Sequence, residues 1–337
     1  MSFIDNVWYK KLGLKNLPVI TALAPFTGLF YVISSLRRLA YSHNLLKKTR
    51  VKTPVIVVGG IAVGGTGKTP LSIALIEHLA FEGYKVGLLS RGYKGNAKQY
   101  PMTVQLTSKV EECGDEPLLV KLSLQDKVTV CVDPNRERGA LHLEHLGMDV
   151  IVCDDGLQHY SLERDLEIIV IDGKRKLGNG FLMPSGPLRE GAWRLKTATA
   201  VVVNGVSDNK DYESMTLVPD DVISLDCYAG NSKNHDYLQK QAKVIALAGI
   251  GNPQRFYNTL KECGYYIEEN IDVPDHGVVS FDILKEKAEL YPVVMTAKDA
   301  VKYARSGIKN LFVLNVKAVL AKSLYQKITD CLEDWNK

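Results

Sequence analysis

Short runs of apolar residues alternate with longer segments of helical period along most of this chain. The runs are rich in β-branched residues, and helix-length stretches such as Glu116–Ser123 and Arg136–Leu146 lie between them. Apolar runs of this length, separated by helical segments, predict a parallel sheet with helices on both faces. The strands predicted in this way are Val55–Val58, Val86–Ser90, Val128–Val132, Asp149–Cys153, Glu167–Ile171 and Ala200–Val203.

A second set of alternating elements follows a polar interval. Residues 206–242 are polar and irregular in pattern, so we place a linker there. A chain of 337 residues is long enough for two domains with separate cores. We predict an N-terminal membrane-associating segment 1–45, a first α/β domain 46–205, the linker, and a smaller α/β domain 243–337. The second set consists of strands Val244–Ala248, Val293–Thr296 and Leu311–Val316 and helices Gln254–Cys263, Phe281–Leu290 and Ala318–Trp335.

The N-terminal segment is assigned to the membrane because an uncharged stretch, Asn16 to Leu36, lies between basic residues. A helix over this stretch can span a membrane, lie in the membrane interface, or be buried under the first domain. Pro18 and Pro25 disfavour a straight spanning helix. We favour membrane association, and no small-residue site for signal-peptide cleavage is present. The apolar face of the helix consists of Val19, Ile20, Leu23, Phe26, Phe30, Ile33 and Leu36.

Composition and charge narrow the class of protein further. The hydrophobic content of 46% and charged content of 24% are typical of a globular protein. Residues 1–52 contain nine Lys or Arg and one Asp, whereas the net charge of the whole chain is only +4. The excess of positive charge therefore lies in the N-terminal segment and not over the whole chain. We expect no nucleic-acid partner. The six cysteines form no C-x-x-C pair, which predicts reduced thiols rather than disulfides or zinc ligands.

A glycine-rich loop joins the first predicted strand to a predicted helix. Its glycines allow the backbone to curl around phosphate oxygens, Lys68 supplies a mobile cation, and Thr69 supplies a hydroxyl for Mg²⁺. The pattern departs from the usual phosphate loop because Ala62 stands where a glycine is expected. Strand, loop and helix in this order predict a P-loop NTPase-type fold that binds ATP. The loop residues are Ala62, Val63, Gly64, Gly65, Thr66, Gly67, Lys68 and Thr69.

Two acidic residues follow the fourth strand of the first set. In phosphate-loop folds, an acid at the carboxyl end of a neighbouring strand holds the metal ion. Asp154 and Asp155 are therefore candidate Mg²⁺ ligands with Thr69. A turn or helix-capping role is the alternative for either residue.

Three other places carry candidate catalytic groups. Asp115 and Glu116 precede a predicted helix, where Asp115 is a candidate general base for a substrate hydroxyl, or else a helix cap. Arg189 and Glu190 end a rigid stretch rich in glycine and proline, and Arg189 is a candidate phosphate-binding cation. His276 lies in a loop of the second domain, where a single histidine is more often structural than catalytic.

Six of these motifs occur in the order and spacing of a known family. They resemble tetraacyldisaccharide 4′-kinase, the lipid A 4′-kinase, over about residues 10–330. The sequence departs from that family's usual pattern at Gly60, Ala62 and Leu157, and none of these changes removes a reactive group. The motifs are Val63–Pro70, Ser90–Tyr93, Gly114–Pro117, Asp154–His159, Gly178–Gly180 and Pro184–Glu190.

This resemblance implies a function and a set of site residues. The enzyme would use ATP and Mg²⁺ to phosphorylate the 4′-hydroxyl of an acylated glucosamine disaccharide 1-phosphate, giving the lipid A precursor lipid IVA. It would act at the cytoplasmic face of the inner membrane of a Gram-negative type envelope, and no oligomer is indicated. The resemblance assigns the catalytic Asp to Asp115 and its partner His to His276. Further candidate active-site residues are Glu116, Arg136, Gln158, His159 and Glu190.

Two other functions are compatible with a phosphate loop. One is a kinase for a soluble sugar or nucleoside, which would have no use for an apolar N-terminus flanked by bases. The other is a non-enzymatic, nucleotide-gated membrane adaptor, which would dimerise with nucleotide and transfer no phosphate. Partition of the activity with membranes would distinguish the lipid kinase from a kinase for a soluble substrate. Transfer of phosphate would distinguish it from the adaptor.

Overall fold

The strands of the computed structural model form one continuous sheet. The structure describes all residues except 1–2, 10–12, 14–15, 233–235, 275–276 and 336–337. Among the described residues, the strand order is β10-β9-β11-β12-β8-β7-β6-β1-β5-β2-β4-β3. The strands are β1 Val55–Gly59, β2 Val86–Ser90, β3 Met102–Val104, β4 Val128–Val132, β5 Val150–Asp154, β6 Leu166–Asp172, β7 Ala200–Asn204, β8 Glu213–Ser224, β9 Lys243–Ala248, β10 Tyr266–Asp272, β11 Val293–Thr296 and β12 Leu311–Leu320.

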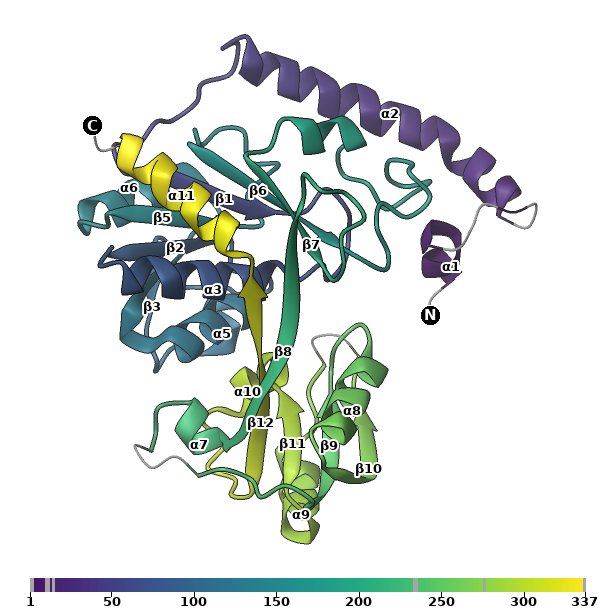
Figure 1. Cartoon of the computed structure of the whole chain (residues 1–337), viewed down its shortest axis with the longest axis vertical. Coiled ribbons are helices and arrows are strands. Elements are labelled where there is room, and N and C mark those ends of the chain that lie inside the picture. Colours follow the sequence, from purple (N-terminus) through teal and green to yellow (C-terminus); the bar gives the residue numbers. More distant parts are fainter. Residues whose placement is uncertain (1–2, 10–12, 14–15, 233–235, 275–276, 336–337) are drawn as a thin grey trace.

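Helices connect most of these strands and cover the sheet (Figure 1). Short 3₁₀ turns occur at Gln125–Lys127 and Ala192–Lys196. The α-helices are α1 Phe3–Tyr9, α2 Leu17–Ser42, α3 Lys68–Phe81, α4 Val110–Cys113, α5 Asp115–Leu124, α6 Arg136–His145, α7 Leu225–Tyr228, α8 Pro253–Glu262, α9 Phe281–Leu290, α10 Ala297–Tyr303 and α11 Lys322–Trp335. The alternation of strand and helix predicted from the apolar runs is confirmed, and with it the mixed α/β fold with a mostly parallel sheet.

A long antiparallel ribbon, β8 with β12, joins the two halves of the sheet. β8 pairs in parallel with β7 only at Glu213–Met215, and then continues in the same direction until Ser224 lies opposite Phe312. β12 pairs in parallel with β11 at Leu311–Leu314 and continues back until Leu320 lies opposite Met215. The carboxyl ends of both parallel sets therefore point toward each other along the ribbon (Figure 1). Ligands of open α/β sheets bind at carboxyl ends, so this arrangement positions the site between the halves.

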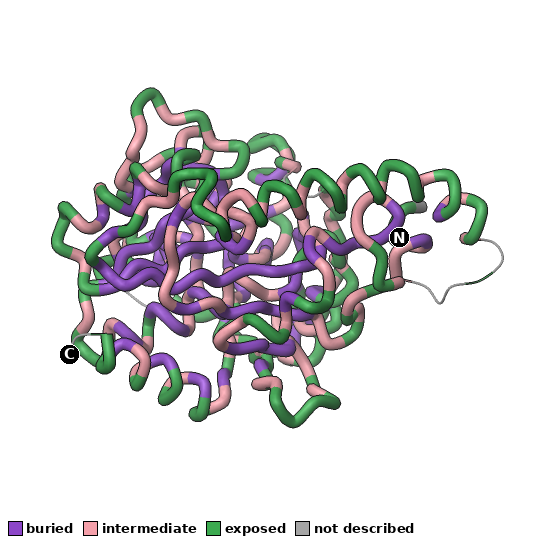
Figure 2. The backbone as a smooth tube through the Cα atoms, turned by 90° about the horizontal axis from the view of Figure 1, so that it is seen from above, coloured by how far each residue is buried: buried purple, intermediate pink, exposed green. Residues whose placement is uncertain are grey.

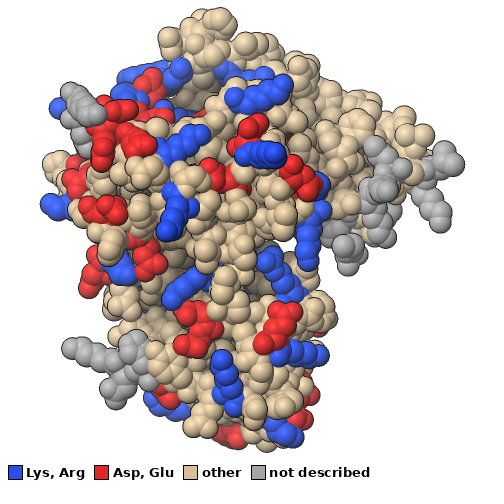
Figure 3. Space-filling model, in the orientation of Figure 1, with Lys and Arg blue, Asp and Glu red and all other residues tan. Residues whose placement is uncertain are grey.

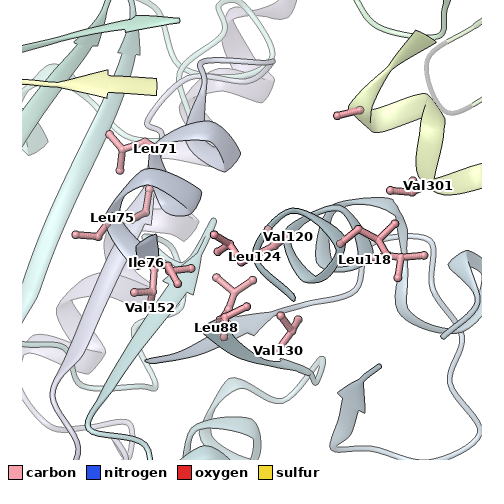
Figure 4. Close-up of a cluster of buried hydrophobic side chains, with 14 of the residues drawn as sticks. Leu71, Leu75, Ile76, Leu88, Leu118, Val120, Leu124, Val130, Val152 and Val301 are labelled. Carbon is pink, nitrogen blue, oxygen red and sulfur yellow. The ribbon is translucent and has the colours of Figure 1, made fainter. Parts of the chain in front are cut away.

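The apolar core is continuous across the two halves. Leu71 and Leu75 of α3 are completely buried against the sheet, together with Leu118 of α5 (Figure 4). Val301 of α10 belongs to the same cluster, and α5 and α10 are in contact. Helices from the first and second sets thus pack directly on one another.

Two predictions for the later part of the chain are wrong. Residues 206–242 are not irregular throughout, because β8 and α7 lie within them. The strand predicted at Leu311–Val316 extends to Leu320, so the last helix begins at Lys322 rather than Ala318. This helix packs on the first half of the chain, where the Tyr325 ring lies 4.2 Å from the ring of His78. The division into domains at 206–242 stays a prediction.

The N-terminal helix α2 runs along the outside of the molecule (Figures 1 and 2). It spans Leu17–Ser42, contains Pro25, and is long and apolar enough to cross a membrane, with 6% of its most apolar window buried. The interpretation as a helix buried under the first domain is therefore wrong. Phe26, Ile33 and Leu36 of the predicted apolar face are 58–62% exposed. Figure 3 shows a broad area without charged side chains over the middle of α2.

The cysteines agree with a reduced state. All six are free thiols, and Cys113, Cys131, Cys153 and Cys227 are buried. Burial raises the pKa of Cys113 and of Cys131 to about 12, so these thiols stay protonated and unreactive.

Candidate functional site

The phosphate loop lies between β1 and α3, as predicted, at the carboxyl edge of the sheet. Gly64 and Gly67 have φ angles of +112° and +99°, which side chains other than glycine rarely adopt. A methyl group on Gly67 would lie 2.6 Å from Nδ2 of Asn204. That amide donates to the carbonyl of Thr66 at 3.1 Å, so β7 fixes the last turn of the loop. The loop therefore has the curled backbone that phosphate binding requires.

The glycine- and proline-rich stretch is the structural partner of this loop. The Val63 N–H donates to the Pro187 carbonyl at 2.9 Å, and the Arg189 N–H donates to the Ile61 carbonyl at 2.7 Å. This short antiparallel pairing fixes the stretch beside the phosphate loop and brings Arg189 next to it.

Asp155 forms ion pairs with two of the predicted cationic residues. Its carboxylate lies 3.6 Å from Nζ of Lys68 and 3.0 Å from a guanidinium nitrogen of Arg189. Burial alone would raise the pKa of Asp155, but Lys68 and Arg189 outweigh it and hold the pKa below its usual value. The structure thus brings Lys68, Asp155 and Arg189 together at the mouth of the phosphate loop.

Asp154, the neighbouring acid, has a different environment. It ends β5, is 4% exposed, and accepts a hydrogen bond of 3.2 Å from the Ser72 hydroxyl. Burial, reinforced by the charge of nearby Glu116, raises its pKa to about 7. Lys68 and Arg136 favour the ionised form of this carboxylate, but they do not outweigh the effects of burial and Glu116 on its pKa.

The residues present fit a Mg²⁺ ion bound with a nucleotide. No cluster of three or more His, Cys, Asp or Glu side chains with metal-ligand geometry occurs among the described residues. Mg²⁺ in phosphate-transfer sites needs only one or two carboxylates, because phosphate oxygens and water complete its octahedron. Asp154 with its raised pKa, together with the hydroxyl of Thr69 one turn before Ser72, supplies such a hard oxygen set.

Arg136, a predicted active-site residue, is buried and bonds to the backbone beside the candidate site. It is 2% exposed, and its guanidinium donates to the carbonyls of Leu89 and Asp154, each at 2.8 Å. These carbonyls lie at the carboxyl ends of β2 and β5. Arg136 therefore fixes the two strand ends that carry the candidate site.

Gln158 and Glu190 belong to a hydrogen-bonded network behind the cations. The Gln158 amide donates to Glu190 at 2.7 Å, and its oxygen accepts from Arg189 at 3.5 Å. Glu190 also accepts from the Tyr160 hydroxyl at 2.7 Å and pairs with Arg194 at 3.1 Å. Tyr160 and Arg194 were missed in the sequence because no motif marks them.

His159, the last residue of that motif, is held neutral. Burial, followed by the charges of Arg136 and Arg91, lowers the pKa of His159 to about 4. The imidazole therefore carries no charge near neutral pH.

Asp115 and Glu116 form the first turn of α5. Gly114 is the N-cap of this helix, and Asp115 is 7% exposed at its first position, so Asp115 is not the cap. Glu116 lies close enough to Asp154 to raise its pKa. His276 lies outside the described residues, so the prediction that it pairs with Asp115 has no structural test.

Comparisons with known proteins identify the family. Residues 19–333 match the family of tetraacyldisaccharide-1-P 4′-kinases, LpxK. A tetraacyldisaccharide 4′-kinase of Tolumonas auensis is 40% identical over 332 residues, which cover 98% of each chain. One from Pseudoalteromonas atlantica is 43% identical over 307 residues, covering 90% of this chain and 97% of the relative.

A solved structure supports the same assignment. The crystal structure of LpxK from Aquifex aeolicus in complex with ATP superposes with a TM-score of 0.75 at 29% identity. The match covers 93% of this chain and 99% of the other. The family resemblance drawn from the six motifs is confirmed: this chain belongs to the tetraacyldisaccharide 4′-kinase family.

Proposed function

We propose that this chain transfers the γ-phosphoryl group of ATP to the 4′-hydroxyl of a tetraacylated glucosamine disaccharide 1-phosphate, giving a lipid A precursor. The observation that carries the proposal is the phosphate loop with Lys68, Arg189 and Asp155 gathered at its mouth. The relatives, at about 40% identity over nearly the whole chain, carry this activity in their names.

Phosphoryl transfer depends on positioning and on stabilisation of charge. The loop backbone holds the phosphates, and Lys68 and Arg189 offset the negative charge that spreads over the transferring group. Asp155 keeps both cations oriented before nucleotide binds. Gln158 accepts a hydrogen bond from Arg189 and donates one to Glu190, so these two residues orient the guanidinium.

Asp154 and Thr69 would hold Mg²⁺. The ion, when bound, supplies further positive charge beside the nucleotide phosphates. The raised pKa of Asp154 supports this assignment, because a nearby cation would restore its ionised form.

Asp115 is the proposed base for the sugar hydroxyl, assisted by His276. The contact between α5 and α10 supports an approach of the two halves at this point. α10 also holds the loop that follows β10: Lys302 donates to the Gly277 carbonyl at 2.9 Å, and Tyr303 accepts from the Val279 N–H at 2.7 Å. The sequence neighbour of His276 is thus tied to the helix that contacts the Asp115 helix.

The lipid substrate would enter from a membrane surface beside α2. The exposed apolar side chains of this helix and the basic residues at its ends suit the cytoplasmic face of the inner membrane. Thr27 of α2 is 2.7 Å from the Ser185 hydroxyl, in the same stretch that carries Arg189. A lipid held along α2 would therefore lie next to the phosphate-transfer site.

The test is transfer of labelled γ-phosphate from ATP to an acylated glucosamine disaccharide 1-phosphate. Water, a soluble glucosamine disaccharide and a nucleoside serve as competing acceptors. Transfer to the acylated acceptor alone is expected. Equal or better transfer to a soluble acceptor would support a kinase of another class, and nucleotide-dependent dimerisation without transfer would support an adaptor.

A further inference from the structure

Arg175 reaches the phosphate loop although no sequence motif marks it. It follows β6, where the Asp172 carboxylate accepts from the N–H groups of Lys174 at 2.9 Å and of Arg175 at 2.8 Å. This turn directs the half-buried side chain to the loop. A methyl group built on Gly64 would lie 3.2 Å from a guanidinium nitrogen of Arg175.

Tyr9, the last residue of α1, fixes the Arg175 guanidinium in this place. The guanidinium carbon lies 5.0 Å from the centre of the Tyr9 ring, within the range of a cation–π contact. The Tyr9 hydroxyl donates to the Val63 carbonyl at 2.8 Å. Arginine, tyrosine and loop thus form one contact unit at the exposed rim of the phosphate cradle.

The charge of Arg175 is not compensated by a carboxylate. Lys68 and Arg189 both pair with Asp155. Within the described parts of the chain, no Asp or Glu forms an ion pair with the Arg175 guanidinium, and Asp172 of the same turn accepts from backbone N–H groups. An uncompensated guanidinium beside a phosphate cradle is a site for an anion.

We propose that Arg175 binds the terminal phosphates of the nucleotide from the rim of the phosphate loop, in addition to Lys68. This inference rests on the proposed function, since it requires a nucleotide in the loop. A guanidinium donates to two phosphate oxygens at once, whereas an ammonium acts as a point charge. The Tyr9 ring keeps the planar guanidinium oriented, and Gly64 leaves room for it.

The experiment compares nucleotide binding in the full-length protein carrying Arg175→Ala, Arg175→Lys or Lys176→Ala. Lys176 is the matched control, because it is the next residue and its exposed side chain pairs with Asp208 instead. Dissociation constants for ATP, ADP and AMP are measured by calorimetry. Arg175→Ala is expected to weaken ATP binding about 10-fold, or about 1.4 kcal/mol, with less than about a 2-fold effect on AMP. The dissociation constant of Arg175→Lys for ATP should lie between those of Arg175→Ala and the wild type. That of Lys176→Ala should match the wild type.

Three outcomes would overturn the inference. Unchanged ATP binding with a raised KM for the lipid acceptor would mean that the guanidinium recognises the lipid phosphate. Equal weakening of ATP and AMP, with a lower melting temperature of the unliganded protein, would mean a structural brace. Wild-type ATP binding by Arg175→Ala with no other change would remove any role. Failure of the proposed function is distinguishable, because then the wild type itself would not bind ATP or transfer phosphate.

Discussion

At the scale of residues, the largest loss of activity is expected from replacing Lys68. Lys68→Ala should lower kcat by at least about 10³-fold, because a cation at the transferring phosphoryl group stabilises charge that develops in the transition state. The fold should survive, since Asp155 keeps its ion pair with Arg189. Turnover with labelled ATP measures the loss, and thermal unfolding is the control. Near-normal turnover by the folded variant would contradict the assigned nucleotide site.

The titration of Asp154 should make the free energy of unfolding depend on pH. Its carboxyl titrates near 3.8 when the chain is unfolded and near 7 when it is folded. Between these values the folded state holds the proton and the unfolded state does not, so the free energy of unfolding falls as pH rises from about 4 to 7 and levels off above. Asp154→Asn removes this titration and keeps an acceptor for Ser72.

We therefore expect Asp154→Asn to raise the free energy of unfolding at pH 8, without nucleotide, by an amount on the order of 4 kcal/mol. The gain should shrink steadily at lower pH and vanish near pH 4. Urea unfolding at several pH values measures it. Parallel pH profiles for the variant and the wild type would show that this carboxyl does not carry the raised pKa, and would weaken its assignment to Mg²⁺.

Residues with a motif around them could be predicted, and residues without one could not. Lys68, Asp155 and Arg189 were singled out because loop, strand end and rigid turn each have a recognisable pattern, and the structure brings all three together. Arg175 stands in an ordinary basic turn. Its significance comes from contact with Tyr9, which is far away in sequence, and no local pattern records such a contact.

At the scale of elements, strands with a regular sequence pattern could likewise be predicted, and strands without one could not. Strands such as β1 and β5 are buried along their whole length and mostly apolar, and they were predicted within one or two residues. β8 was missed because much of it is exposed on a two-stranded ribbon and because Pro219 and two acids interrupt its pattern. The ribbon accommodates Pro219 opposite an irregularity in β12 between Leu314 and Val316.

Substitutions on the outer face of α2 should separate membrane binding from folding. Removal of residues 1–40 would weaken membrane binding, but it would also delete the Tyr9 contact with Val63. A triple Phe26→Gln, Ile33→Gln, Leu36→Gln variant changes only exposed side chains. We expect it to lose binding to anionic vesicles and to raise the KM for the lipid acceptor more than that for ATP, because burial of apolar side chains drives interfacial binding.

Phe81→Gln is the matched control for the α2 triple variant. Phe81 is 86% exposed at the end of α3, so its replacement removes an exposed apolar side chain away from α2. Vesicle sedimentation and acceptor kinetics are compared for the two proteins. Full sedimentation of the triple variant at moderate salt would mean that another surface binds the membrane.

At the scale of the whole molecule, the ribbon turns the carboxyl ends of two parallel sets toward each other. The first set contributes the phosphate loop and Asp154, and the second contributes the loop after β10 and α10. The contact of α5 with α10 is one of the places where the halves meet. This geometry could not be predicted from the sequence, because it depends on a ribbon whose first strand was assigned to a linker.

The last prediction tests whether catalysis depends on both halves. Asp115→Ala and His276→Ala should each lower kcat strongly, because a base within hydrogen-bond reach must take the proton of the sugar hydroxyl. Groups that act as a unit give non-additive losses, so the double variant should be little slower than the slower single variant. ATP binding should survive in all three, since neither residue belongs to the phosphate loop. Fully additive losses, or ordinary turnover by His276→Ala, would leave Asp115 as the base without a partner from the second half.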